Sequence, residues 1–185
     1  MIADQRVHIW KRYIQARFPF HESRIGAFIL SWMSARGGRI VPLKSGIQPA
    51  NFAPLLPYMW IMKYLPEDDD FLIVLAGEKV NHAHHGNVAG RTRREIIGET
   101  DYEILQRPLR IAIQDQTITY LTANSPLSRV EYQNGERVYA PVNADDGSAD
   151  YLLGISLYTI MSSHQEFDVG TAEERFTIPC SELPD

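Results

Sequence analysis

Three histidines close together are the strongest candidates for chemistry in this sequence. His82, His84 and His85 lie in the segment EKVNHAHHGNVAG, residues 78–90. Imidazole nitrogens are common metal ligands, and a metal site needs several ligands converging on one point. On a helix, Glu78, His82 and His85 share a face, whereas His84 points elsewhere. The spacing allows three interpretations: a solvated helix surface, a histidine that contacts a ligand, or a metal site.

A group of arginines follows directly. Arg91, Arg93 and Arg94 come after a glycine, and guanidinium groups suit carboxylates and phosphates. One interpretation is an anionic ligand. The other is a solvated cationic surface whose arginines pair with Glu95 or Glu99.

Other catalytic patterns are absent from the sequence. It contains no GxSxG, HExxH or GxxxxGK[ST] motif. Neighbouring carboxylates occur at residues 68–70 and 145–146, which are predicted turns exposed to water. We therefore expect no catalytic residues and no metal, and we keep a small metal-dependent enzyme based on the three histidines as an alternative.

The composition narrows the class of protein. The chain has 185 residues and a net charge of −5, so no basic surface indicates nucleic-acid binding. A single cysteine, Cys180, cannot form an internal disulfide and fits a reducing compartment. No apolar run reaches the roughly 18 residues of a membrane span, and the N-terminus does not resemble a signal peptide. We expect a cytoplasmic protein.

A β-hairpin over residues 58–77 is the central element of the predicted fold. Two apolar runs flank an acidic turn at residues 66–70. The second run, residues 71–76, carries no charge, which predicts a strand near the middle of a sheet.

Two amphipathic helices are predicted before the hairpin, over residues 4–17 and 23–36. Their apolar stripes carry the large side chains Trp10, Ile14, Phe28 and Trp32. These side chains either pack helix against helix or form the interface of a homodimer. Residues 39–57 hold four prolines and predict a loop with one helical turn.

Short helices and then strands are predicted after the hairpin. A short helix begins at Glu78, a turn follows at residues 92–97, and a longer helix runs to Ile113 with a kink or break at Pro108. Later strands are predicted at 117–122, at 129–133 and 136–142 around an Asn134-Gly135 turn, and at 151–160. The expected fold class is α+β, with a five-stranded antiparallel sheet and short helices on one face.

The ordered set of motifs resembles the PAS_5 group of bacterial PAS domains over roughly residues 24–160. The resemblance is carried by WMSARGG, RIVP, IQP, LLP, LAG and GNVAGR, at residues 32–38, 39–42, 47–49, 55–57, 75–77 and 86–91, and by Pro141. Together with the predicted elements, it divides the chain into N-terminal helices over 1–38, a PAS-like domain over 39–162 and a C-terminal tail over 163–185, which we expect to lie on the surface or to fray.

The resemblance implies a stand-alone, non-enzymatic sensor that binds a small molecule between helices and sheet, or relays signals through contacts with a partner protein. A ligand-free interaction module is the alternative. Haem is not expected, because the helix ending at Ile113 has no histidine, cysteine or methionine. A flavin-reactive cysteine is missing, because Cys180 lies outside the domain, so the cofactor stays unknown. The candidate ligand contacts are Trp60, His82, His85, Arg91 and Tyr139.

Overall fold

The computed structural model describes residues 2–100, 102–122, 132–148, 150–160 and 174–185. A six-stranded antiparallel sheet forms its centre, in the order β2-β1-β5-β4-β3-β6. The strands are β1 Met59–Leu65, β2 Asp70–Ala76, β3 Thr117–Thr122, β4 Tyr132–Val142, β5 Tyr151–Ile160 and β6 Glu174–Pro179. The helices are α1 Ile2–Arg17, α2 Ser23–Ala35, α3 Glu78–Ala83, α4 Arg93–Ile97 and α5 Tyr102–Gln114, with short 3-10 helices η1 Lys44–Gly46, η2 Pro49–Tyr58 and η3 Cys180–Glu182.

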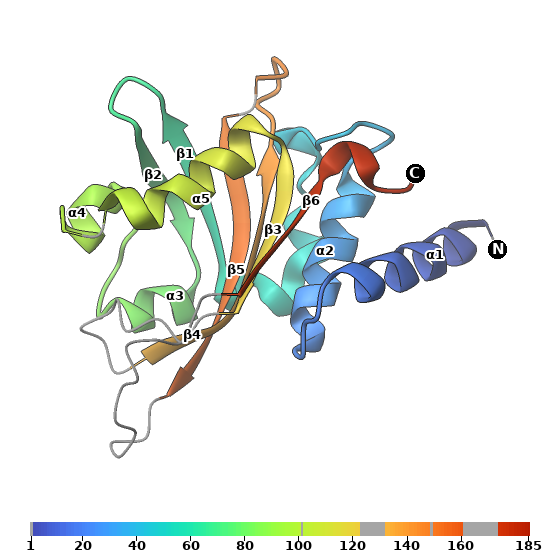
Figure 1. Ribbon diagram of the computed structural model, residues 1–185, viewed down its shortest axis with the longest axis horizontal. Coiled ribbons are helices and arrows are strands. Elements are labelled where there is room, and N and C mark those ends of the chain that lie inside the picture. The colour runs from blue at the N-terminus through green and yellow to red at the C-terminus, as the bar shows by residue number, and fades with distance from the viewer. Residues whose placement is uncertain (1, 101, 123–131, 149, 161–173) are drawn as a thin grey trace.

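Helices cover both faces of this sheet (Figure 1). As predicted, the short helices α3, α4 and α5 gather on one face, which we call the inner face; α5 crosses in front of the strands in Figure 1. The N-terminal helices α1 and α2, with η2, pack on the outer face. Residues of each strand alternate between the two: Val138 and Ala140 join the outer core, and Tyr139 joins the inner one.

The predicted hairpin is present, but its place in the sheet is not the predicted one. β1 and β2 pair antiparallel from Trp60↔Ala76 to Leu65↔Asp70. β2 nevertheless lies at an edge of the sheet, not near its middle. Two of its apolar side chains, Val74 and Leu75, are each 42% exposed, so this strand is less buried than its apolar sequence indicated. The segment after α3 protects part of this edge: Ile73 N donates to Arg91 O over 2.9 Å.

The predicted Asn134-Gly135 turn is also wrong. β4 runs straight through these residues and pairs with β5 along its length, with a shift of register between Asn134 and Glu136. Glycine in a strand can mark a bulge as well as a turn, and here it marks a bulge. The predicted strand at 129–133 lies mostly outside the described residues.

A sixth strand replaces part of the expected surface tail. β6 pairs antiparallel with β3, from Thr117↔Pro179 to Thr122↔Glu174. Ile178 is 3% exposed and joins the outer core, so burial of apolar side chains favours pairing over fraying. The chain then enters η3, where Cys180 is buried.

The first and last described segments of the chain contact each other. Trp10 Nε1 donates to the carbonyl of Asp185 over 3.2 Å. Tyr13 Oη donates to the carbonyl of Glu182 over 3.0 Å. These contacts fix α1 against the segment that follows β6.

The four side chains proposed for a dimer interface are buried within a single chain. Trp10 is 6% exposed, and Ile14, Phe28 and Trp32 are fully buried in the outer core. The indole of Trp32 donates to the carbonyl of Pro141 over 3.0 Å. They form the packing of helix on helix and on sheet, and they have almost no surface to give to a second copy. Homodimerisation itself stays a prediction.

The remaining predicted helices form, with small differences. α5 runs through Pro108 without a break. Among the described residues, no helix has the length and apolar character needed to cross a membrane.

Candidate ligand site and its link to the N-terminal helices

Two of the candidate ligand residues, Trp60 and Tyr139, meet on the inner face. Their ring centroids are 6.0 Å apart, and both side chains are buried. The indole of Trp60 lies over Gly154 of the neighbouring strand, where an added Cβ would stand 2.4 Å from the ring. Only glycine allows this approach. The Trp60 Nε1 then reaches Ser156 Oγ at 3.0 Å.

Ser156 also holds an arginine that the sequence analysis did not single out. Arg137 stands opposite Ser156 in the pairing of β4 with β5, and its Nε donates to the same hydroxyl oxygen over 3.0 Å. Ser156 Oγ therefore accepts hydrogen bonds from both Trp60 and Arg137. The sheet brings a guanidinium group next to the aromatic pair.

A second guanidinium group comes from α4. Arg93 Nε donates to Gln106 Oε1 over 3.2 Å, and Gln106 on α5 is fully buried. Burial, followed by the positive charge of Arg137, lowers the pKa of Arg93 to about 10. The two arginines therefore act on each other electrostatically, although they come from different elements.

His84 lies within the field of the same arginines. His84 is exposed to solvent. Desolvation by the surrounding chain, followed by the positive charges of Arg137 and Arg93, nevertheless lowers the pKa of its imidazole to about 4. The imidazole is therefore neutral at pH 7.

The other charged candidates stay at the surface. His82, His85 and Arg91 are exposed, because α3 buries Val80 and Ala83 instead. The side chain of Arg91 donates to the carbonyl of Glu95 over 2.9 Å.

The proposed metal set of Glu78, His82 and His85 does not gather. Within the part of the chain that the structure describes, no group of three histidine, cysteine or acidic side chains could hold a metal ion. The short α3 helix ends at Ala83, and His85 follows with a positive φ of 55°, so the helical spacing assumed for the three side chains does not continue to His85.

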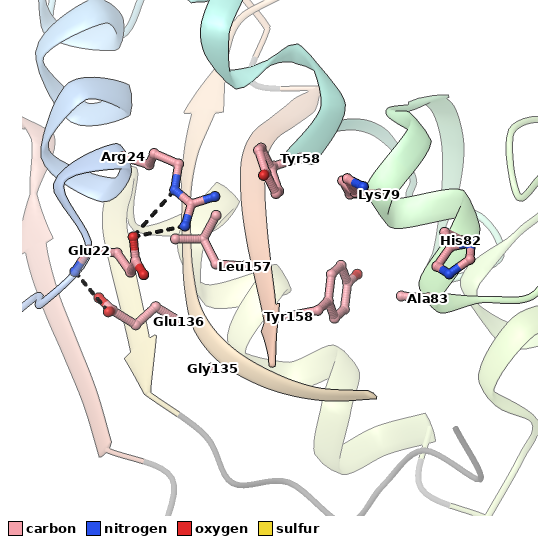
Figure 2. Close-up of a pocket in the computed structure, with 10 residues that line it drawn as sticks. All are labelled: Glu22, Arg24, Tyr58, Lys79, His82, Ala83, Gly135, Glu136, Leu157 and Tyr158. Atoms are coloured by element: carbon pink, nitrogen blue, oxygen red, sulfur yellow. Dashed lines mark hydrogen bonds and ion pairs between the residues drawn. The ribbon is translucent and has the colours of Figure 1, made fainter. Parts of the chain in front are cut away.

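A cleft of about 430 Å³ opens between the start of α2 and α3 (Figure 2). Arg24 and Glu22 lie on one side of it, and Lys79 and His82 project from α3 on the other. The full lining is Glu22, Arg24, Tyr58, Lys79, His82, Ala83, Gly135, Glu136, Leu157 and Tyr158. His82 is thus the one predicted ligand contact that reaches this cleft.

The buried carboxylate of Glu136 joins the sheet to α2. Its Oε1 accepts from the backbone N–H of Glu22 over 2.9 Å, and its Oε2 accepts from that of His21 over 3.2 Å. The hydroxyl of Tyr120 donates to Oε2 over 2.9 Å. Ser23 is the first helical residue of α2, and no side chain of the residue before it caps the helix. A residue of strand β4 therefore accepts backbone amides at the start of α2, as a capping side chain would.

Sequence patterns contained a signal for Glu136. It shares one side of β4 with Val138, Ala140 and Val142, so a carboxylate occupies an otherwise apolar face. A charge in such a position needs hydrogen-bond partners. The residue that follows it, Arg137, faces the opposite side of the sheet.

Parts of this chain are similar to a protein family and to solved structures. A family model described as "PAS domain", PAS_5, matches residues 20–157. Among solved structures, a sensory box sensor histidine kinase from Vibrio cholerae is 13% identical with a TM-score of 0.45, covering 64% of this chain and 94% of that chain. A LOV protein from Rhodobacter sphaeroides is 17% identical with a TM-score of 0.43, covering 57% of this chain and 61% of that chain. No curated protein matches.

Proposed function

The chain belongs to the PAS_5 family of PAS domains, and on this premise we propose that it is a non-enzymatic sensory domain that couples a small molecule to a partner protein. The ligand binds on the inner face, near Trp60, Tyr139 and Arg137. The change passes through β4 to α2 and α1, and these helices present it to the partner.

One observation supports this proposal most directly. Glu136 and Arg137 are consecutive residues of β4, with Glu136 bonded to the start of α2 and Arg137 bonded on the inner face. Movement of one side chain therefore displaces the backbone that carries the other. The bulge between Asn134 and Glu136 interrupts the ladder beside them and gives the strand a place to adjust.

The mechanism is a shift of population between two arrangements of α2. A ligand shifts such an equilibrium only by its difference in affinity for the two states. Loss of a helix cap costs about 1 kcal/mol. A ligand that prefers one arrangement by about tenfold, or about 1.4 kcal/mol, can therefore offset the hydrogen bonds that Glu136 gives α2.

Hydrogen exchange of the backbone amides of residues 20–28 tests the relay. A metabolite thermal-shift screen first supplies a compound that binds. We expect this compound to change exchange at the start of α2 in the natural protein, and to change it much less in Glu136→Gln. Glu22→Gln is the matched control, because Glu22 lies beside the same cap but pairs with Arg24. Unchanged exchange at α2 in the presence of a bound compound contradicts the relay.

A ligand-free interaction module is the second candidate. The complete burial of Tyr139 and the near-complete burial of Trp60 favour it, since both rings are buried by the chain itself, without a ligand. A chain that takes up no compound in the screen, yet retains a partner through α1 and α2, supports this alternative.

A further inference from the structure

We propose that the inner face binds a small organic anion, whose carboxylate lies between the guanidinium groups of Arg93 and Arg137. This inference rests on the proposed sensory function and names the class of its ligand. Three independent observations support it.

Arg93 and Arg137 differ in their partners from four other arginines of the described residues. Arg17, Arg24, Arg94 and Arg110 all form ion pairs with carboxylates. Arg93 and Arg137 form no such pair among the described residues; their Nε atoms donate to the neutral oxygens of Gln106 and Ser156. The hydrogen bonds described for them leave the terminal NH₂ groups available for a planar, bidentate acceptor.

The positive charge around this pair is offset only in part. Arg137 disfavours the charged form of Arg93, and both disfavour protonation of His84. The carboxylate of Asp70 acts favourably on Arg93, but its oxygens accept from the backbone amides of Phe71 and Arg94 over 2.6 and 3.4 Å. Because the Arg93 pKa of about 10 is well above neutral pH, the cluster remains cationic, and a bound anion would relieve its repulsion.

Gln106 supplies a third sign of a missing partner. Its side chain is fully buried, and its Nε2 has no acceptor among the described residues. Its Oε1 holds Arg93, so the unsatisfied amide group sits beside the guanidinium. A buried donor without an acceptor costs stability. A ligand carboxylate bound to Arg93 would lie beside Gln106, and one of its oxygens would accept a hydrogen bond from Gln106 Nε2.

Solvent reaches the residues of this cluster. Arg93 and Arg137 are half-buried, and His84 is exposed. Two singly charged guanidinium groups beside buried aromatic rings suit a carboxylate better than phosphate. Phosphate carries more charge, so its transfer from water to this site has a higher desolvation cost.

Succinate and acetate are suitable probes, with succinamide as the neutral isostere of succinate and inorganic phosphate as the competing anion. Ligands that bind the folded state raise the midpoint of thermal unfolding, and isothermal titration gives the dissociation constant. We expect succinate to bind and succinamide not to bind. Arg93→Gln and Arg137→Gln should each weaken succinate about tenfold or more, since each removes a hydrogen bond to a charged group.

Arg94→Gln is the matched control. Arg94 is the next residue of α4 and pairs with Glu99 at the surface over 2.6 Å, so its loss should leave succinate binding unchanged. Circular dichroism confirms folding, and Arg93→Lys and Arg137→Lys replace any glutamine variant that does not fold. Three results overturn the proposal: equal binding of succinamide, equal weakening by Arg94→Gln, or no carboxylate binding to the natural protein. Preferred binding of phosphate overturns the carboxylate assignment.

The outcome separates this inference from the proposed function. If succinate binds but leaves exchange at α2 unchanged, the ligand class stands and the relay fails. If no carboxylate binds while another compound changes exchange at α2, the sensory function stands and the ligand class fails.

Discussion

Glu136 and Arg137 follow each other on β4 but serve opposite layers of the molecule. Glu136 accepts the amides of His21 and Glu22 at the start of α2, and Arg137 donates to Ser156 below the short helices. A strand alternates its side chains between faces, so one short stretch can connect the layers on opposite faces of the sheet. This relationship and three other features of the fold lead to four predictions that can be measured in the unliganded protein.

Replacement of Glu136 should loosen the start of α2. In Glu136→Gln, a neutral amide replaces a buried carboxylate that accepts three hydrogen bonds, and its NH₂ group faces donors. We expect a loss of about 1.5–3 kcal/mol in the free energy of unfolding. Urea unfolding measures the loss, and hydrogen exchange locates it. Glu22→Gln, at a half-exposed ion pair, should cost less than about 1 kcal/mol; an equal cost for both variants contradicts the role given to Glu136.

The close approach of Trp60 to β5 predicts a strong effect at Gly154. In Gly154→Ala the new Cβ meets the indole at 2.4 Å, so the ring or the strand must move. Overpacking of this kind costs about 1–3 kcal/mol. Urea unfolding followed by circular dichroism measures it. Gly86→Ala is the control, because nothing lies within 4 Å of its added Cβ, and it should be close to neutral.

The buried tryptophans of α1 and α2 should affect stability and not assembly. We expect Trp10→Ala and Trp32→Ala each to lower the free energy of unfolding by about 3–5 kcal/mol. Sedimentation mass should stay the same in either variant that folds, since both side chains pack inside one chain. Val7→Ala, at a position 45% exposed on α1, should change stability little. A change from dimer to monomer in a folded Trp10 or Trp32 variant would restore these residues to an interface.

The lowered pKa of His84 predicts a dependence of stability on pH. The folded-state pKa of about 4 lies below the unfolded value of 6.5. The contribution of His84 is therefore complete above pH 6.5 and is lost as the pH falls toward 4, because the unfolded chain takes up the proton first. His84→Asn should flatten this part of the curve of urea midpoint against pH. His8→Asn, on the exposed surface of α1, is the control; equal flattening would contradict the assignment to His84.

The sequence predicts those elements of the fold that local patterns of residues determine. The β1–β2 hairpin and the helices α1 and α2 follow from apolar runs and helical periodicity, and they form near the predicted bounds. The order of strands does not follow from such patterns. The edge position of β2, the bulge at Gly135 and the pairing of β6 with β3 all depend on contacts between distant residues.

The residues of the candidate site also fall into two groups, those that the sequence indicates and those that only the fold brings to the site. Trp60 and Tyr139 were predictable as aromatic residues on strands, and Arg93 belongs to the arginine group noted in the sequence. Arg137, Ser156 and Gln106 become visible only through the register of β4 on β5 and the packing of α5. The histidines, which dominate the local sequence, face solvent instead.

The contact between α1 and the segment after β6 also bears on how the chain folds during synthesis. The acceptor of the Trp10 indole is the carbonyl of Asp185, which the ribosome adds long after α1 has emerged. Domains generally begin to fold from the end that is made first. Here Trp10 and Tyr13 lack these two acceptors until residues 182–185 leave the ribosome, although α1 can already pack against α2.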